Sequence, residues 1–484
     1  MRPISPPIAL SALLASAMLL AGCTVGPNYA GPPASPASKA AVFARAGDAP
    51  VTPTPPLARW WEALGDPTLN ALVTSALAAN PDVAVVEARL RQARASLRLA
   101  RANQAPTISP TAIYAHAHLP GINLGNSDSS DSSSNSSNGS SDLNFYNLGF
   151  DASWEVDLFG GQRRTVQAAR ASAEAAQANV ADAQVSLSAE VVAAYVNLRD
   201  RQRRIALGNR SVAMQEQMFA LASQRYDRGA ASKLDVARLR QQLDSTRADI
   251  TPLSAELDAY LDELATLTGE APGALDPTLA VAQPVPLPPA TVAIGDPAAL
   301  LQRRPDIRAA ERTLAADTAK VGVAEAARFP KLSFMGIVGV GGTSPSDLTN
   351  LDDFAALVAP QLSWSFLDFG RNKARVVQAE GVRDEADAQY RAAVLAALRD
   401  AEDSLSRFRY RRVTVATLAR AKASADEAVT LSAQRYRAGT ITLIDLLDAQ
   451  RQQIAAEQNL SVAEAGLTGD FVAIQKALGL GWSS

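Results

Sequence analysis

The chain has 484 residues, of which 47% are hydrophobic, a formal net charge of −3 at pH 7 and a single cysteine. A charge near zero without a prominent basic cluster argues against a nucleic-acid partner. One cysteine excludes an internal disulfide, and its position near the N-terminus leaves no thiol for a metal site or a catalytic nucleophile in the rest of the chain.

The N-terminus has the features of a bacterial lipoprotein precursor. After the basic Arg2, residues Ile8 to Leu20 form an apolar run that is too short to span a bilayer. The run leads into Ala21-Gly22-Cys23, and small residues before a cysteine are typical of a lipoprotein signal peptidase site. We therefore predict a signal peptide over 1–22 and a mature protein that begins at Cys23, with lipid on its thiol. The alternative is an ordinary signal peptide that a cysteine follows by chance.

The residues after this point indicate the destination of the protein. Thr24 stands where an aspartate would retain a lipoprotein in the inner membrane, so the outer membrane is the default destination. Residues 23–65 are expected to form a lipidated N-terminal extension. No apolar run after residue 22 approaches the roughly 20 residues that a membrane helix needs. Any later membrane-spanning segment must therefore consist of strands.

The mature chain contains an internal duplication. Two motifs recur 210 positions later: Trp154–Gly160 as Trp364–Gly370, and Gln224–Gly229 as Gln434–Gly439. An earlier motif, Asn80–Val83, recurs 224 positions later at Arg304–Ile307. The 14 additional residues of the first copy fall near the Ser/Asn/Asp/Gly-rich tract Gly125–Asp142, which we interpret as a flexible loop between two strands.

Each repeat is predicted to contain helix, strand, loop, strand, very long helix, tight turn and helix. The repeats cover 66–269 and 298–479, with a Pro-rich linker over 270–297 between them and a short tail over 480–484. The predicted elements of the first repeat are strands at about 107–119 and 144–158, a long helix at about 160–228 and a tip turn at 229–232. Those of the second repeat are strands at about 331–341 and 355–367, a long helix at about 370–438 and a tip turn at 439–442.

The two long helices are supported by the positions of proline. None occurs from Gly121 to Thr251 or after Pro360, and a proline inside a helix costs about 3 kcal/mol. Each helix can therefore extend over about 68 residues, roughly 100 Å. In the first helix, steps of three and four residues predict a packed stripe, mostly of alanine: Val166, Ala169, Ala173, Ala176, Val180, Ala183, Leu187, Val191, Ala194 and Leu198. The strands beside these helices favour a barrel of helices over the alternative, a two-stranded coiled coil.

The predicted strands have the alternation of membrane strands. From Tyr146 to Leu158, apolar residues alternate with polar residues or glycine over 13 positions. The strand over 107–119 alternates more weakly, with Ile113, Ala115, Ala117 and Leu119 expected on one face and Tyr114, His116 and His118 on the other. In the second repeat, we expect a common apolar face for Leu332, Phe334, Val338 and Val340, and again for Leu362, Trp364 and Phe366. Alternating segments of about ten residues are typical of outer-membrane barrels, although a half-buried strand of a soluble sheet has the same pattern.

Four strands are too few to close a membrane barrel, because bacterial barrels begin at about eight strands. An open sheet in lipid would leave two edges of unpaired backbone groups, each group costing several kcal/mol. Two copies of the chain would give a barrel that side chains fill, whereas three copies give twelve strands with room for a pore. The sequence therefore predicts a homotrimer.

The chain has only two histidines, His116 and His118. Both lie on one face of a predicted strand, where they form an incomplete metal site. We interpret them as polar lining of the lumen rather than as metal ligands, and we predict no metal site and no cofactor other than the covalent lipid on Cys23.

Four segments of the chain resemble a known family. They are Cys23-Thr-Val-Gly26-Pro27-Asn28-Tyr29, Trp60-Trp61 followed by Gly65-Asp66-Pro67, Gln434-Arg435-Tyr436-Arg-Ala-Gly439, and Leu443–Gln450. Together with the duplicated plan of strands and long helices, they resemble the TolC-like outer-membrane factors and, at the N-terminus, the NodT-type efflux lipoproteins. The resemblance extends from Cys23 to about Gly479.

This resemblance implies a mainly α fold with membrane β-strands: a duplicated β-hairpin plus a very long α-helical hairpin. Three chains would form a twelve-stranded β-barrel in the outer membrane, above an α-helical barrel in the periplasm with a partial belt near its middle. Pro252 and the segment Pro272–Pro297 would lie in or near that belt. The partners implied are a periplasmic adaptor, also called a membrane fusion protein, and an inner-membrane pump of the RND type. The function implied is passive export of small molecules such as drugs and toxic compounds.

The tip turns are the predicted site of gating and of adaptor contact. Asp445 and Asp448 lie three residues apart and so share a helix face, and Asp235 is the counterpart of Asp445. The resemblance places these carboxylates at the constriction, where their repulsion would raise some pKa values above about 4. The other residues expected in the gate are Tyr226, Tyr436, Arg225 and Arg435. The residues expected to contact the adaptor are Gly229, Ala230, Ser232, Gly439, Thr440 and Thr442.

No catalytic motif is recognisable in the sequence. It contains no His-Glu-x-x-His, no phosphate-binding Walker loop and no Gly-x-Ser-x-Gly elbow, so an enzyme is not expected. Two other interpretations remain beside an efflux channel. One is a channel for protein secretion with the same architecture, and the other is a periplasmic stalk without a pore.

Overall fold

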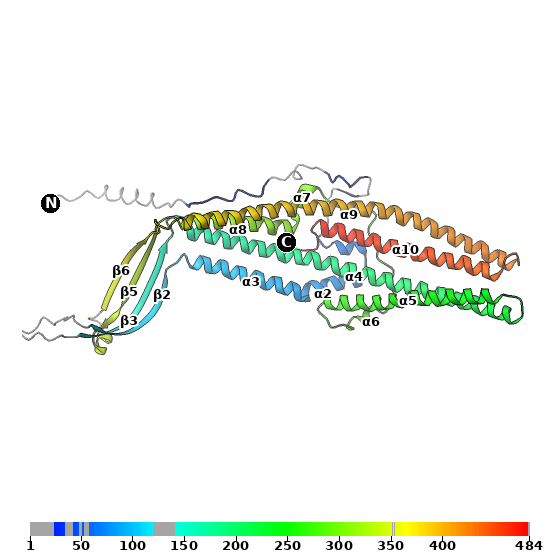
Figure 1. Ribbon diagram of the computed structural model, residues 1–484, viewed down its shortest axis with the longest axis horizontal. Helices are drawn as coiled ribbons and strands as arrows, with labels where there is room; N and C mark the ends of the chain where they lie inside the picture. Colours follow the sequence, from blue (N-terminus) through cyan, green and yellow to red (C-terminus); the bar gives the residue numbers. More distant parts are fainter. Residues whose placement is uncertain are drawn as a thin grey trace, which may run out of the picture. The chain divides into compact units, whose positions relative to one another are not determined.

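The computed structural model describes residues 24–33, 42–47, 51–52, 58–119, 141–350, 352 and 354–482 (Figure 1). The predicted signal peptide, Cys23 and most of the Ser/Asn-rich tract lie outside the described residues. The chain divides into two compact units. Unit 1 comprises the N-terminal residues to Gly31, Gln92–Ala173 and Thr313–Ala386, and unit 2 comprises Pro32–Arg91, Glu174–Arg312 and Asp387–Ser484.

Unit 1 contains a four-stranded antiparallel sheet in the order β2-β3-β5-β6 (Figure 1). Its strands are β2 (Thr107–Leu119), β3 (Ser141–Val156), β5 (Lys331–Gly342) and β6 (Phe354–Ser363), and a short helix, η3 (Pro345–Leu348), lies between β5 and β6. The two hairpins, one from each repeat, pair through β3 and β5. The strands β2 and β6 each have one strand neighbour, and so form the edges of the sheet.

Helices precede and follow each hairpin in the chain. They are α3 (Pro81–Ala102), α4 (Gly161–Asp227), α8 (Pro305–Ala326) and α9 (Arg371–Arg437). The duplicated motif acts here as a helix start. The carboxylate of Asp157 accepts the backbone N–H of Gln162 (3.0 Å) and of Arg163 (2.8 Å), and Asp368 accepts those of Gly370 and Asn372 in the same way. These bonds satisfy N–H groups that the first turn of a helix leaves without a partner.

Unit 2 contains two long helical hairpins with short turns. The helix α4 returns through α5 (Lys233–Leu267), and α9 returns through α10 (Leu443–Ala477) (Figure 1). Pro252 lies inside α5, as its position in the sequence suggested. Smaller elements complete the unit: β1 (Val51–Thr52), η2 (Trp60–Leu64), α2 (Pro67–Ala79), α6 (Asp276–Leu279), β4 (Val292–Ala293) and α7 (Pro297–Arg303).

The main hydrophobic core lies in unit 2. Trp60 and Trp61, each 2% exposed, pack edge to face at 5.9 Å between ring centroids, and Trp60 packs in the same way on Phe471. Side chains from α2, α4, α5, α7, α9 and the Pro-rich segment join this core, among them Leu69, Leu198, Leu264, Leu279, Leu300 and Phe408. The family-like Trp60-Trp61 motif therefore has a packing function.

One helical stretch, Pro67–Ala102, is long and apolar enough by composition to cross a membrane. The expectation that no such stretch follows residue 22 is therefore wrong as a statement about composition. The stretch is not one helix, because the chain is extended at Asn80, where α2 ends and α3 begins. With 13 residues, α2 spans about 20 Å, less than the roughly 30 Å of a bilayer core, and its Leu69, Val73 and Ala76 are buried in unit 2.

The heptad stripe predicted for the first long helix is only partly buried in the single chain. From Leu187 onwards the predicted positions are buried, but Val166, Ala169, Val180 and Ala183 are only half-buried. A second alanine stripe is buried instead in this part of α4: Ala168, Ala171, Ala175 and Ala178. Two stripes of alanine run along this helix, and periodicity alone does not indicate which one a single chain covers.

Candidate functional site

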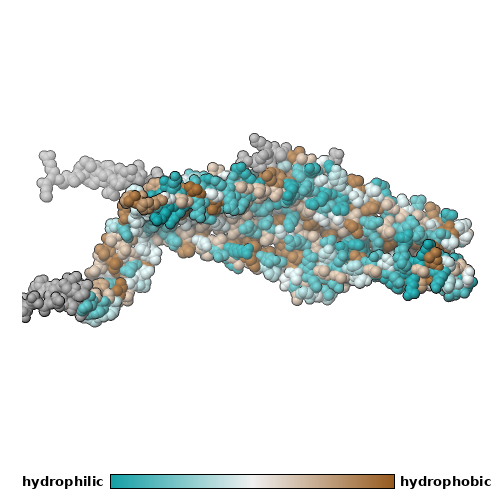
Figure 2. All heavy atoms as spheres, viewed as in Figure 1, coloured by the Kyte–Doolittle hydropathy of each residue, from teal (hydrophilic) through white to brown (hydrophobic). Residues whose placement is uncertain are grey.

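The register of the sheet brings apolar side chains onto one face. Residues that pair directly across strands share a face, and the row Pro110–Phe150–Val338–Ala356 crosses all four strands. The rows on either side are equally apolar, for example Ala112–Leu148–Val340–Phe354. We call this side the apolar face. It is exposed over the strands (Figure 2), with Val358 70% and Leu362 68% accessible.

The opposite face carries more polar side chains. Asp151, Asn147, Ser153, Ser333 and Gln361 lie on it, by the same register. The hydroxyl of Thr111 donates to Asp151 at 2.6 Å across the β2–β3 pair. An apolar face and a more polar face on one sheet are what a barrel wall between lipid and water requires.

The register contradicts the expected orientation of β2. Tyr114 pairs with Tyr146 and His116 pairs with Asn144, so these side chains lie on the apolar face of the sheet. Ile113 lies on the polar side, opposite Asn147. The prediction that His116 and His118 line the lumen is therefore wrong, because both residues lie on the apolar face. Alternation fixes which residues share a face, but the face itself is set by pairing with β3, whose pattern is stronger.

At this end of the apolar face the polar groups contact one another. The Tyr114 and Tyr146 rings lie 5.0 Å apart. The Asn144 Oδ1 atom accepts the Tyr114 hydroxyl at 3.3 Å and lies 2.9 Å from His116 Nδ1. Within the described ranges, no group of three or more His, Cys, Asp or Glu side chains is placed to hold a metal ion.

The other end of the sheet carries two tryptophans in equivalent positions. Trp154 donates its indole N–H to Gln104 O at 2.9 Å, and Trp364 donates to Arg328 O at 3.0 Å. Trp364 follows β6 and does not belong to it, so the strand expected over 355–367 ends earlier than predicted. Strand pairing ends at Lys331–Ser363, because the residue before Lys331 is a proline, which has no N–H to donate. Indoles with one polar bond beside an apolar surface are typical of a membrane interface.

The first described residues are held tightly within unit 1. The side chain of Arg164, only 2% exposed, donates to Val25 O at 3.1 Å and to Gly26 O at 2.9 Å. Burial lowers the pKa of Arg164, and the neighbouring charge of Arg163 adds to this shift. A Cβ on Gly26 would overlap Gly322 Cα, so the two backbones approach as closely as glycine permits. The segment just after Cys23 is therefore an integral part of unit 1, which the sequence did not predict.

The tip turns are formed in the same way in both repeats. Gly229 (φ +74°) and Gly439 (φ +70°) end the helices with backbone bonds back to Tyr226 O and Tyr436 O. The next residues, Ala230 and Thr440, donate their N–H groups to the carbonyls of Arg225 and Arg435. The returning helices begin with capping boxes, Ser232 with Asp235 and Thr442 with Asp445.

The capping role of Asp445 changes its expected titration. Its carboxylate accepts the Thr442 hydroxyl and the Thr442 N–H, both at 2.8 Å. These bonds lower the pKa of Asp445 from its ordinary value, the side-chain bond being the larger cause. In the single chain the pKa of Asp445 is thus lowered, whereas the upward shift was expected from repulsion between the three copies of the trimer and stays a prediction. Asp448 accepts from Arg451 (2.9 Å) and Gln452 (2.8 Å) on its own helix.

Unit 2 also contains a buried polar network that the sequence did not predict. Tyr195 donates its hydroxyl to Asp66 Oδ2 at 2.6 Å and accepts from Arg199 at 3.1 Å. Arg199 is 1% exposed and donates to Val281 O at 2.8 Å. Burial, followed by the bond to Asp66, raises the pKa of Tyr195 to about 12. Asp66 also caps α2, so the network joins α2, α4 and the Pro-rich segment.

Comparison with known proteins identifies the family. The profile of outer membrane efflux proteins matches residues 72–270 and 297–480. Nodulation protein T of Rhizobium leguminosarum bv. trifolii is 30% identical over 472 residues, covering 96% of both chains. Outer membrane protein OprJ of Pseudomonas aeruginosa is 30% identical over 500 residues, covering 99% of this chain and 96% of OprJ.

The fold agrees with a solved structure as well. The outer-membrane channel OprN superposes with a TM-score of 0.85 at 36% sequence identity, over 95% of this chain and 100% of that chain. Proteins of this family are transport channels and not enzymes. The protein is located in the outer membrane and is the outer-membrane channel of a tripartite efflux system. The chain belongs to the outer membrane efflux protein family.

Proposed function

We propose that three copies of the chain form one passive channel for small molecules, and that the protein catalyses no reaction. In this assembly the three sheets close into a twelve-stranded barrel in the outer membrane. The helices continue the channel through the periplasm, toward a periplasmic adaptor protein and an inner-membrane pump of the RND type.

The observation that carries this proposal is the open, four-stranded sheet with one apolar face. Its edges, β2 and β6, each present one row of backbone groups without a strand partner in the described chain. In lipid such groups cost several kcal/mol each. Closure with neighbouring copies removes the edges, and three copies of four strands give an even-numbered barrel wide enough for a lumen.

One further feature, on α4, supports the trimer. The half-buried stripe on α4, from Val166 to Ala183, offers small side chains for close packing with a neighbouring helix. The measurement is the mass of the detergent-purified protein by light scattering. A mass of three chains is expected, and a monomer would refute the closed barrel. A tag between Ser127 and Ser141 is expected to be accessible on intact cells, since the Ser/Asn-rich loop would lie outside.

We infer a lipid anchor on Cys23 from the signal sequence. The tight docking of residues Thr24 to Gly26 supports a defined position for this anchor. Intact-mass spectrometry should show a mature chain that begins at Cys23 and carries acyl chains. An unmodified Cys23, or cleavage elsewhere, would refute the anchor without affecting the trimer.

We place the gate and the adaptor contact at the tips. The gate would consist of Asp445 and Asp448 with Asp235, Tyr226 and Tyr436, together with Arg225 and Arg435. The exposed turns would meet the adaptor through Gly229, Ala230, Ser232, Gly439, Thr440 and Thr442. Tyr226 and Tyr436 are 44% and 40% exposed in the single chain, and thus available to a neighbour.

Protein secretion is the alternative that the sequence alone left open for this architecture. Deletion of the gene separates the two. Increased susceptibility to drugs with normal protein export supports small-molecule efflux. Unchanged susceptibility together with loss of an exported protein would refute it.

A further inference from the structure

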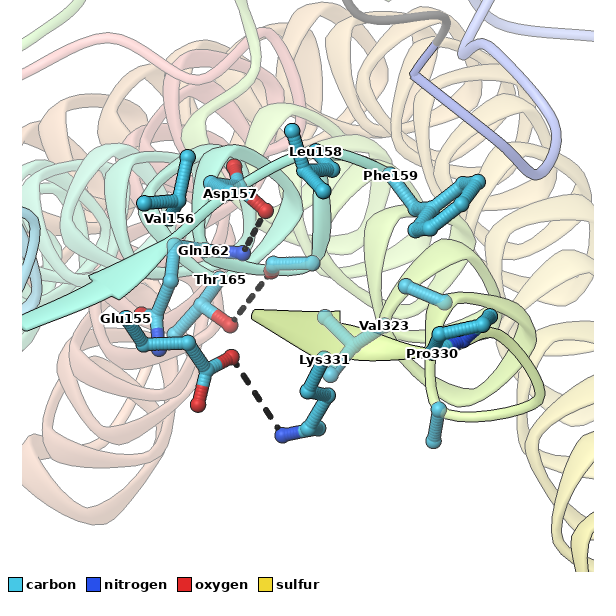
Figure 3. A pocket seen from close by; sticks show the side chains of 13 residues that line it. Glu155, Val156, Asp157, Leu158, Phe159, Gln162, Thr165, Val323, Pro330 and Lys331 are labelled. Carbon is cyan, nitrogen blue, oxygen red and sulfur yellow. Dashed lines mark hydrogen bonds and ion pairs between the residues drawn. The ribbon is translucent and has the colours of Figure 1, made fainter. Parts of the chain in front are cut away.

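A partly enclosed cavity of about 130 Å³ lies in unit 1, where β3 ends and α4 begins (Figure 3). Most of its wall is apolar and comes from the end of β3 and the end of α8: Val156, Leu158, Phe159, Val323, Ala326, Ala327 and Pro330. The Phe159 ring stacks on Phe329 with centroids 4.7 Å apart, which fixes that part of the wall. None of the residues proposed for the gate or the adaptor contact lines this cavity.

The charged groups of the cavity neutralise each other. Lys331 Nζ lies 3.4 Å from Glu155 Oε1 (Figure 3). Asp157 is occupied by the N–H groups of Gln162 and Arg163 at the start of α4. The cavity therefore presents no free charge of either sign from these residues, and its occupant is expected to be apolar instead of an anionic or cationic head group.

The N-terminal segment is fixed to the wall of this cavity. Val25 donates its N–H to Phe159 O at 3.1 Å. Thr24 packs closely on Gly160: a Cβ atom on Gly160 would lie only 2.6 Å from Thr24 Cγ2. Gly160 also has φ +83°, a conformation that favours glycine. The buried Arg164 side chain donates hydrogen bonds to the carbonyls of Val25 and Gly26. Because Cys23 precedes Val25 by two residues, its backbone lies at most about 7 Å along the chain from that bond.

We propose that this cavity is a binding site for part of an acyl chain, and that the chain belongs to the lipid on Cys23. The inference rests on the lipidation put forward above. A cavity of similar size with apolar walls can hold a small apolar molecule such as benzene. It has room for roughly four methylene groups, each about the volume of a water molecule. A chain tethered a few ångströms away has a high effective concentration at the site, an advantage that a free phospholipid lacks.

The consequence is that the lipid both anchors the protein and packs into it. The acyl chain would fill space between the end of β3 and the end of α8, next to the docked N-terminus. The anchor would then stabilise unit 1 directly, in addition to holding the chain at the membrane.

The test uses the full-length wild-type protein from cells supplied with a diazirine-bearing fatty acid. After irradiation and purification, tryptic peptides are mapped by mass spectrometry. The lipidated N-terminal peptide, Cys23–Lys39, is expected to be cross-linked through its acyl chain to Val321–Arg328, which contains three residues of the cavity wall. A lipidated Cys23 without this cross-link, or with only free phospholipid cross-linked to Val321–Arg328, overturns the proposal and leaves the lipid anchor intact. An unmodified Cys23 overturns both.

A second measurement tests the energetic coupling between lipid and cavity. Ala327→Phe is expected to fill the cavity, and Ala324→Phe, on the same segment but outside the cavity wall, is the matched control. Each is compared with and without lipid, the latter with a non-lipoprotein signal peptide and Cys23→Ser. Lipidation is expected to raise Tm by a few degrees in the wild type and in Ala324→Phe, and to leave it unchanged in Ala327→Phe. An equal effect of lipidation in all three proteins would contradict the site.

Discussion

A charge on the apolar face is expected to prevent membrane insertion, whereas a charge on the opposite face is tolerated. Phe150 is the most direct position, because it lies in the middle part of β3, is 54% exposed in the single chain and belongs to a row that is apolar across all four strands. Lysine at the bilayer midplane on the lipid side of a barrel costs about 2–4 kcal/mol. In a trimer, Phe150→Lys would therefore cost about 6–12 kcal/mol if the three sites are independent.

The matched control is Ile337→Lys. Ile337 pairs with Asp151, so it lies on the polar side of the sheet and only one residue from the level of Phe150. A lysine there gains an opposite charge across the strand pair, worth about 0.2–1 kcal/mol.

The assay is the urea concentration at which each variant unfolds from lipid bilayers, together with the amount of trimer in the outer-membrane fraction. Phe150→Lys is expected to abolish or strongly reduce both, and Ile337→Lys to resemble the wild type. If the control is the more damaging of the two, the faces are assigned the wrong way round. If both are tolerated equally, the sheet is not a membrane barrel.

Three other predictions concern the helical part. Tyr195→Phe removes the hydroxyl between Asp66 and Arg199 and is expected to destabilise the protein by about 2 kcal/mol, seen as a lower urea midpoint; an unchanged midpoint would mean that water replaces the hydroxyl. Because the pKa of Asp445 is lowered by the Thr442 bonds, its capping contribution is complete above the unfolded pKa of about 4 and is lost as pH falls through the lower folded value. Amide exchange at the start of α10 should therefore increase only in acid, and exchange that is independent of pH, after correction for the intrinsic rate, would contradict this role. Asp445→Ala combined with Asp448→Ala is expected to alter single-channel conductance and its block by millimolar divalent cations; no change would make these carboxylates surface charges.

The duplication was the most informative feature of the sequence. The repeated Trp154–Gly160 and Trp364–Gly370 motifs indicated a strand followed by a long helix. The first motif extends from the end of β3 to the start of α4, and the second lies between β6 and α9. These features are local, since they depend on proline-free runs, on period-two alternation and on a carboxylate that caps the next helix. Local patterns of this kind are visible in one chain without partners.

The errors arose where two local patterns compete or where a partner is distant in sequence. The alternation of β2 is real, but only pairing with β3 reveals that Tyr114 and His116 lie on the apolar face. The capping boxes could have been recognised from Ser232-Lys-Leu-Asp235 and Thr442-Leu-Ile-Asp445, which would have predicted the lowered pKa of Asp445 in the single chain. The bonds from Tyr195 to Asp66 and from Arg164 to Val25 join residues more than 120 positions apart, and no periodicity predicts such contacts.

The most direct test of the central claim is the single-channel conductance of the purified wild-type protein in planar lipid bilayers. A passive channel made of three closed sheets is expected to produce discrete, reproducible steps of ion current that scale with the conductivity of the solution. Insertion into the bilayer is checked by the protection of the strands from proteolysis. If the inserted protein gives no current under any voltage or cation condition, even with the tip aspartates replaced, this result contradicts the channel and indicates a structural stalk.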